Sequence, residues 1–230
     1  MIHGIDHLAI AVHDPDAAIA ELASTLGIPP GVSGGRHNAW GTRNRLLWLG
    51  DTFIELVTVF DARLAERSWL GRATLTALEA NPNAATAVAW AISTDDLDLD
   101  RAELNAAGAS LGKPIAGERR RTDGTIVRWR LSLPPDVDLA RPFLIEHDMT
   151  AAEWTPEDRA NRAASPARVA GLALPVEAIE GLPDVEDGAA LGDQVVGIAD
   201  RDDARPIVRV TGLNRGAAVA DAIGCRWLID

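Results

Sequence analysis

Two stretches of this sequence repeat the same order of secondary-structure elements, and this repeat constrains the fold more than any other feature. Residues 5–12 alternate with the period of a β-strand, and residues 44–49 and 53–60 predict two further strands. Between them, Asp14-Pro15-Asp16 is typical of a helix start and Gly27 of a helix end. The order is strand, helix, a glycine-rich loop or short strand, strand, strand.

A second stretch repeats this order. Its predicted elements are a strand at 87–94, a helix that ends at Gly108, and strands at 125–133 and 143–147. The segment Leu144-Ile145-Glu146 repeats Phe53-Ile54-Glu55 at the matching place in the order. Self-similarity of this kind indicates two copies of one structural unit. We therefore predict a paired α+β domain over residues 1–150, with a connecting helix at 66–79.

The tail of the chain follows this pattern only weakly. Strands are predicted at 169–174, 194–198 and 207–210, but no amphipathic helix separates the first two. Residues 151–230 are therefore expected to form either a partial third unit or a covering subdomain that packs on the repeats, and both alternatives stay open.

The charge balance excludes some classes of partner. Of the 230 residues, 22 are basic and 34 acidic, which gives a formal net charge of −12. Such a surface repels phosphate backbones and anionic membranes, and no apolar run approaches the roughly 20 residues of a membrane span. We expect no nucleic-acid or membrane partner. The lone Cys225 and an N-terminus without a signal-peptide pattern favour a cytoplasmic location.

Three polar residues stand out within the predicted strands. His7 shares its strand face with Ala9 and Ala11, whose small side chains leave room beside the imidazole. Glu55 and Glu146 each lie in an apolar strand, where a carboxylate is costly unless it is paired or bound to a metal. The residues therefore indicate a shared metal or acid–base site, and the alternative for His7 is an ordinary hydrogen-bonded strand histidine.

The order of several short motifs resembles a known family. These motifs are Ile5-Asp6-His7-Leu8-Ala9-Ile10, Gly34-Gly35-Arg36-His37, Gly41-Thr42-Arg43-Asn44 and Phe53-Ile54-Glu55-Leu56. Within the repeated frame, over about residues 1–150, they are similar to the glyoxalase-like domain branch of the vicinal oxygen chelate superfamily. The resemblance implies tandem βαβββ units in a curved mixed sheet, with a partial third unit at the C-terminus.

The resemblance also implies a divalent metal on the concave face of the sheet, chelated by two adjacent oxygens of the substrate. By position, its ligands would be His7, Glu55 and Glu146, while the expected fourth position falls on Val88, which cannot bind a metal. A set of one imidazole and two carboxylates suits Mn²⁺, Mg²⁺, Fe²⁺, Ni²⁺ or Zn²⁺. Glu146 or Glu55 would carry the proton in catalysis.

Further residues are candidates for substrate contact. His37 lies on a glycine-rich segment and could also supply a missing nitrogen ligand, and Arg121 belongs to the one local cluster of positive charge. A solvated loop histidine and a solvated arginine are the alternatives. The complete set of substrate-binding candidates is His37, Thr42, Asn44, Trp48, Trp129 and Arg121.

Two functions remain in competition. The first is a metal-dependent enzyme of lyase or isomerase type that acts on a small molecule with vicinal oxygens. The second is a metal-free protein on the same fold that binds or sequesters a small molecule, similar to the bleomycin resistance-like members of the superfamily. The sequence also leaves a homodimer open, in which the paired units would be exchanged between two copies.

Overall fold

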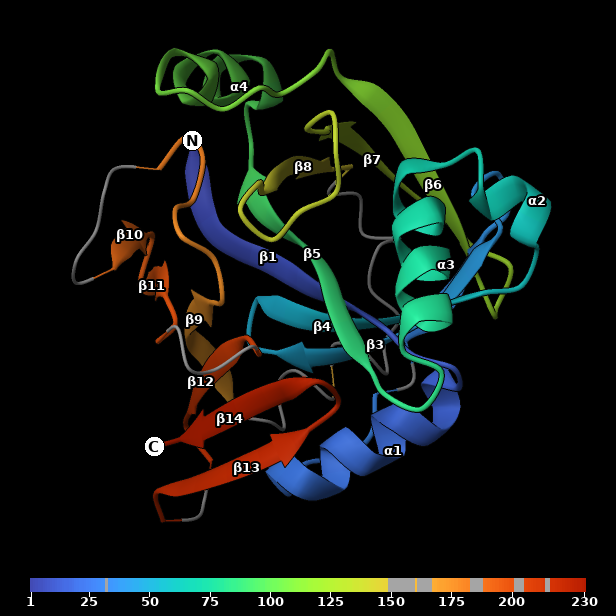
Figure 1. Ribbon diagram of the computed structural model, residues 1–230, viewed down its shortest axis with the longest axis vertical. Helices are drawn as coiled ribbons and strands as arrows, with labels where there is room; N and C mark the ends of the chain where they lie inside the picture. The colour runs from blue at the N-terminus through green and yellow to red at the C-terminus, as the bar shows by residue number, and fades with distance from the viewer. Residues whose placement is uncertain (32, 149–159, 161–166, 183–187, 201–204, 214–215) are drawn as a thin grey trace.

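A computed structural model shows an eight-stranded barrel and a second, six-stranded sheet beside it (Figure 1). It describes residues 1–31, 33–148, 160, 167–182, 188–200, 205–213 and 216–230.

The barrel is built from two βαβββ units. The strands of the first unit are β1 (Ile2–Ala11), β2 (Gly34–His37), β3 (Thr42–Leu49) and β4 (Thr52–Val59). Those of the second unit are β5 (Thr86–Thr94), β6 (Ile115–Arg121), β7 (Ile126–Ser132) and β8 (Phe143–His147). The barrel order is β1-β4-β3-β2-β6-β7-β8-β5. The predicted α+β class and tandem units are confirmed, and the curved sheet closes because β2 pairs with β6 and β1 pairs with β5.

Helix α1 (Pro15–Leu26) follows the expected capping chemistry. The Asp14 side chain accepts hydrogen bonds from the backbone amides of Asp16 and Ala17, and Pro15 occupies the first helical turn. The helix ends at Gly27, whose φ of 70° lies in the left-handed region. In the second unit, α4 (Leu97–Ala106) starts in the same way at Asp96. Helix α1 therefore begins and ends where the sequence indicates, whereas α4 ends at Ala106, two residues before the expected Gly108.

The connection between the units also contributes to the barrel interior. It contains the short helix α2 (Ala62–Ala65) and the longer α3 (Trp69–Ala80). Leu70 of α3 belongs to the same buried cluster as Ala9, Ala11 and Ala89, which project from the inner face of β1 and β5. The small residues near His7 thus make room for a helix as well as for a cavity.

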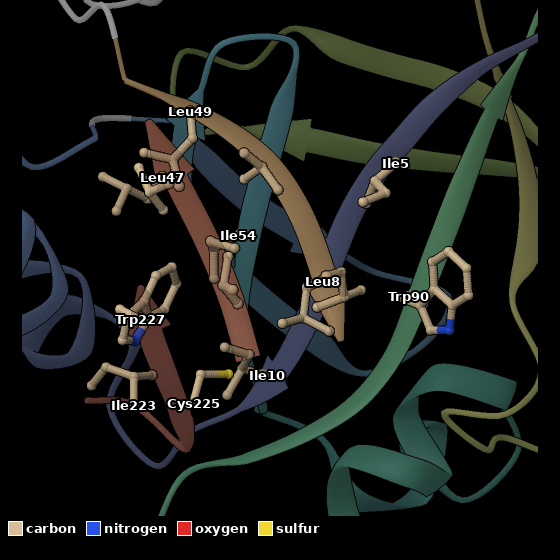
Figure 2. Packing of buried hydrophobic residues seen from close by; sticks show 14 of the residues in the cluster. Ile5, Leu8, Ile10, Leu47, Leu49, Ile54, Trp90, Ile223, Cys225 and Trp227 are labelled. Carbon is tan, nitrogen blue, oxygen red and sulfur yellow. The ribbon is translucent and has the colours of Figure 1, made fainter. Parts of the chain in front are cut away.

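The second sheet packs against the outside of the barrel. Its order is β10-β11-β9-β12-β14-β13. Figure 2 shows side chains from both sheets meeting in one apolar layer, with Leu8, Ile10 and Ile54 of the barrel close to Cys225 and Trp227. The strands are β9 (Arg168–Leu174), β10 (Ala189–Leu191), β11 (Gln194–Ile198), β12 (Ile207–Thr211), β13 (Ala218–Ala222) and β14 (Cys225–Ile229).

A buried amide also links the two sheets. The Oε1 of Gln194 accepts a hydrogen bond from the backbone amide of Ile5 at 2.6 Å, and its Nε2 donates to Thr52 Oγ1 at 2.7 Å and to the carbonyl of Val169 at 3.0 Å. The two sheets thus share polar as well as apolar contacts, and the division of the chain at residue 150 stays a prediction. Among the described residues, no helix combines the length and apolar character that crossing a membrane requires.

Candidate functional site

Strand pairing decides which side chains share the barrel interior. In the parallel β1–β4 pair, His7 lies beside Phe53 and Ala9 beside Glu55. In the antiparallel β3–β4 pair, Leu46 lies opposite Glu55, so Asn44 projects to the same face two residues away. The side chains of His7, Glu55 and Asn44 therefore meet inside the barrel.

The barrel contains an open cavity, and the empty space in the cavity and at its mouth is about 850 Å³. Its walls are largely aromatic and come from both units and from α3. The aromatic lining residues are Trp40, Trp48, Phe53, Trp69, Trp129 and Phe143. The cavity therefore suits a small ligand with an apolar, flat body.

His7 is the best-fixed polar group of the cavity. Its ring stacks on Phe53, with the ring centroids 4.6 Å apart, and meets the edge of Phe143. Its Nδ1 lies 2.6 Å from Oδ1 of Asp6, and its Nε2 lies 3.5 Å from Oε2 of Glu55. Packing and hydrogen bonding together hold Nε2 towards Glu55.

Glu55 is a buried carboxylate that faces this imidazole. Its Oε1 accepts a hydrogen bond from Nδ2 of Asn44 at 2.7 Å. The Oδ1 of Asn44 is itself buried and has no hydrogen-bond partner. A buried acceptor without a partner is costly, so a donor group on a ligand would be stabilised at this position.

His37 enters the cavity from β2. Its Nδ1 lies 2.9 Å from Oγ1 of Thr42, and its Nε2 lies 4.0 Å from Oε1 of Glu55. Burial lowers the pKa of His37 from 6.5 to about 4; the Glu55 carboxylate opposes this shift, and Arg119 and His7 add to it. The His37 imidazole is therefore neutral at pH 7.

The structure brings six of the sequence-predicted site residues to the cavity, namely His7, His37, Asn44, Trp48, Glu55 and Trp129. Thr42 is fully buried behind His37 and contacts the site through that ring. Arg121 is also buried, but Arg119, two residues earlier on the same face of β6, is the arginine that lines the cavity.

Glu146 is not part of this group, and its predicted role needs correction. It lies opposite Arg130 on the outer face of the barrel, and its Oε2 is 3.1 Å from Nη1 of that arginine. The neighbouring His147 lines the cavity instead.

The error arises because the expected match between the last strands of the two units is shifted by one residue from the observed one. In the first unit His7 pairs with Phe53, and in the second unit Ala91 pairs with Phe143 in the corresponding parallel ladder. Phe143 is therefore the counterpart of Phe53, which makes Ile145 the counterpart of Glu55. The expected fourth position likewise falls on Ala91 and not on Val88.

Several site residues were missed by sequence reasoning. Alternation along β6 could have found Arg119, because it is two residues from Arg121. Trp69 lies on the connecting helix, and no local pattern indicates that this helix contributes to the barrel interior. Sequence reasoning also missed the rings of Trp40, Phe53, Phe143 and His147 in the lining.

Comparison with known proteins identifies the family. The glyoxalase-like domain family matches residues 5–181. The chain belongs to this family. The resemblance to the glyoxalase-like branch of the vicinal oxygen chelate superfamily is thereby confirmed. No curated protein matches this chain.

Three solved structures are similar to this chain to different extents. A hypothetical protein from Staphylococcus aureus is 14% identical, with a TM-score of 0.73, and the match covers 100% of this chain and 99% of the other. Methylmalonyl-CoA epimerase from Mycobacterium tuberculosis is 25% identical, with a TM-score of 0.44, and covers 63% of this chain and 86% of its own. The Streptomyces coelicolor epimerase is 22% identical, with a TM-score of 0.46, and covers 65% of this chain and 98% of its own.

The donors in this glyoxalase-like barrel do not fit the divalent metal that the resemblance implies. The second unit supplies Ala91 and Ile145 at the places where the first supplies His7 and Glu55. Glu146, the third predicted ligand, faces outward. Within the part of the chain that the structure describes, no three histidine, cysteine or acidic side chains are arranged to hold a metal ion.

Proposed function

We propose that this glyoxalase-like protein is an enzyme that moves a proton on a small molecule without a metal ion. The observation that carries the proposal is the pair formed by His7 Nε2 and Glu55 Oε2, 3.5 Å apart inside the aromatic cavity. A buried carboxylate and an imidazole that face one ligand space can take up and return a proton.

The proposed reaction uses the carboxylate oxygen of Glu55 that is not bonded to Asn44. Asn44 donates to Oε1 of Glu55, which leaves Oε2 to accept a proton from a carbon next to a carbonyl. As this C–H bond breaks, its electron pair moves to the carbonyl oxygen and forms an enolate. Arg119, buried in the wall, supplies positive charge for the enolate or for a neighbouring carboxylate. Transfer of this proton from Glu55 to the enolate oxygen gives the enol, which is an isomer of the substrate.

The walls support a substrate with a flat apolar body and adjacent oxygens. Trp129 and Trp40 lie edge to face, with their centroids 6.4 Å apart, and His37 meets the edge of Trp129. An aromatic body would pack against these rings while its oxygens face the polar side chains. Chelation of these oxygens by a metal is not part of the proposal, because the donors do not assemble.

A second candidate is a protein that binds the same class of molecule without turnover. The apolar character of most of the cavity wall favours it, since sequestration needs only a complementary pocket. In that case Glu55 would contribute to affinity and to no chemical step.

Phenylpyruvate is a suitable probe, because it combines an aryl ring, two adjacent oxygens and an enolisable carbon. We expect the wild-type protein to accelerate exchange of its C3 protons with D₂O, measured by proton NMR. Glu55→Gln should lower the protein-dependent rate on the order of 10²- to 10⁴-fold, the usual contribution of general acid–base catalysis.

Glu146→Gln is the matched control, because that carboxylate pairs with Arg130 outside the barrel. Its exchange rate should equal that of the wild type. Equal rates for Glu55→Gln and wild type would contradict the proposal. Saturable binding of phenylpyruvate without any exchange would support the second candidate.

A further inference from the structure

Strand β1 contains an irregularity next to the proposed acid–base pair. In its pairing with β5, Ile5 lies opposite Ile92 and His7 opposite Ala91, so Asp6 has no opposite residue. This is a β-bulge, in which one extra residue is inserted on one strand and its side chain is re-aimed. Regular alternation would direct Asp6 away from His7, whereas the bulge brings its carboxylate to the His7 ring.

The carboxylate of Asp6 bridges two histidines from the two units. Its Oδ1 lies 2.6 Å from Nδ1 of His7, and its Oδ2 lies 2.9 Å from Nε2 of His147 on β8. Strand β5 lies between β1 and β8, and its Ser93 lines one pocket together with Asp6 and His147. The bridge therefore crosses β5 at a small side chain.

Asp6 is buried yet placed to stay ionised. Its side chain is buried, and each of its two oxygens has an imidazole nitrogen within hydrogen-bond distance. An ionised carboxylate only accepts hydrogen bonds. Nδ1 of His7 and Nε2 of His147 must therefore both carry hydrogens.

We propose that Asp6 is the positioning residue of the site, which fixes the His7 tautomer with its hydrogen on Nδ1 and so keeps Nε2 towards Glu55 and the ligand. The catalytic role of His7 in this proposal rests on the proposed function. The position of the hydrogen on its ring does not. A carboxylate that orients a catalytic imidazole in this way is a known device of acid–base sites.

The direct test is ¹⁵N NMR of the histidine side chains in the ligand-free protein, which has only five histidines to assign. We expect His7 of the wild type to carry its hydrogen on Nδ1. In Asp6→Asn, whose amide can donate to the ring, we expect the hydrogen to shift to Nε2. A wild-type His7 protonated on Nε2 alone would overturn the proposal even if the variant does not fold, and an unchanged His7 spectrum in a folded Asp6→Asn protein would do the same.

Asp95→Asn is the matched control. Asp95 is an exposed carboxylate whose Oδ2 lies 3.4 Å from Nε2 of His3, outside the cavity. It should alter the His3 signals and leave those of His7 unchanged. If the His7 tautomer changed in Asp95→Asn as much as in Asp6→Asn, the proposal would be overturned. The tautomer would then respond to the loss of any carboxylate and not to Asp6 in particular.

The exchange reaction supplies the second readout. With phenylpyruvate, Asp6→Asn should lower kcat on the order of 10²- to 10⁴-fold, as expected for a catalytic imidazole in the wrong tautomer, and change KM little. A changed tautomer with an unchanged kcat would overturn the positioning role. If the wild type shows no exchange at all, the proposed function fails, while the NMR result still decides the assignment of the His7 hydrogen.

Discussion

His37 is an imidazole that the fold keeps uncharged. It is 3% exposed, and its Nε2 faces the Glu55 carboxylate at 4.0 Å. Burial lowers its pKa more than the Glu55 charge raises it, and Arg119 adds to the lowering. A neutral ring in this position can accept a hydrogen bond from a ligand without adding positive charge to the cavity.

This shift predicts a pH-dependent stability. Because burial lowers the pKa of His37 from 6.5 to about 4, its contribution to the free energy of unfolding is complete above pH 6.5 and is lost as the pH falls towards 4. The loss amounts to about 3 kcal/mol. Urea unfolding of wild type and His37→Gln across this range should show a clearly flatter profile for the variant. His13→Gln, at an exposed histidine, should keep the wild-type slope.

Gly117 is a residue whose missing side chain shapes the cavity. A Cβ added to it would lie 2.1 Å from Nε1 of Trp129, so the indole lies directly against the backbone of β6. The two residues pair across β6 and β7 on the inner face of the barrel. The position of this aromatic wall therefore depends on a glycine that no turn or left-handed φ requires.

Gly117→Ala should displace Trp129 into the cavity. We expect the free energy of unfolding to fall by about 1–3 kcal/mol, the usual cost of overpacking, and the affinity for phenylpyruvate to fall as well. Calorimetric titration and urea unfolding measure the two effects. Gly216→Ala, where an added Cβ meets nothing within 4 Å, should change neither. Wild-type affinity and stability in Gly117→Ala would show that the wall is not fixed in this way.

At the scale of elements, β1 joins the site to the second sheet. Gly4 has a φ of 151°, and a Cβ there would lie 2.4 Å from Oε1 of Gln194. This close approach lets Gln194, the only glutamine of the chain, bond to Ile5 of β1 and Thr52 of β4. The second sheet thus holds the two strands that carry His7 and Glu55 at their shared end.

Gln194→Ala should weaken this junction. It leaves the buried amide of Ile5 and the carbonyl of Val169 without their partner, and each buried group left unpaired costs about 1–3 kcal/mol. The midpoint of urea unfolding should therefore fall. Val195→Ala, at a half-exposed position on the same strand, should have little effect. Equal midpoints for wild type and Gln194→Ala would contradict this account of the junction.

At the scale of the whole molecule, the two units have the same fold but unequal chemistry. The first supplies His7, Glu55, His37 and Asn44, whereas the second supplies mostly apolar wall together with Arg119 and His147. The expected site would take its ligands from both units, whereas the polar groups of the observed cavity come mainly from the first unit. This asymmetry is the basis for proposing proton transfer without a metal.

The repeat, the helix ends and the place of His7 and Glu55 could be predicted from the sequence, because they depend on local periodicity and capping. The role of Glu146 could not be predicted, because Glu55 and Glu146 lie in similar apolar segments. Only the pairing of Phe53 with His7 and of Phe143 with Ala91 fixes the register between the two units. The bulge at Asp6 and the closure of β2 on β6 depend on contacts between distant strands, which no local pattern contains.

Metal independence is the central claim, and one measurement tests it most directly. The rate of deuterium exchange into phenylpyruvate is followed with wild-type protein that has been treated with a chelator, before and after stoichiometric Mn²⁺, Mg²⁺, Fe²⁺, Ni²⁺ or Zn²⁺ is added. Because Glu55 Oε2 and His7 Nε2 lie 3.5 Å apart inside the cavity, where the described residues form no metal-binding set of donors, we predict the same rate in every sample. Loss of exchange on chelation, with recovery on addition of one of these ions, would contradict the account.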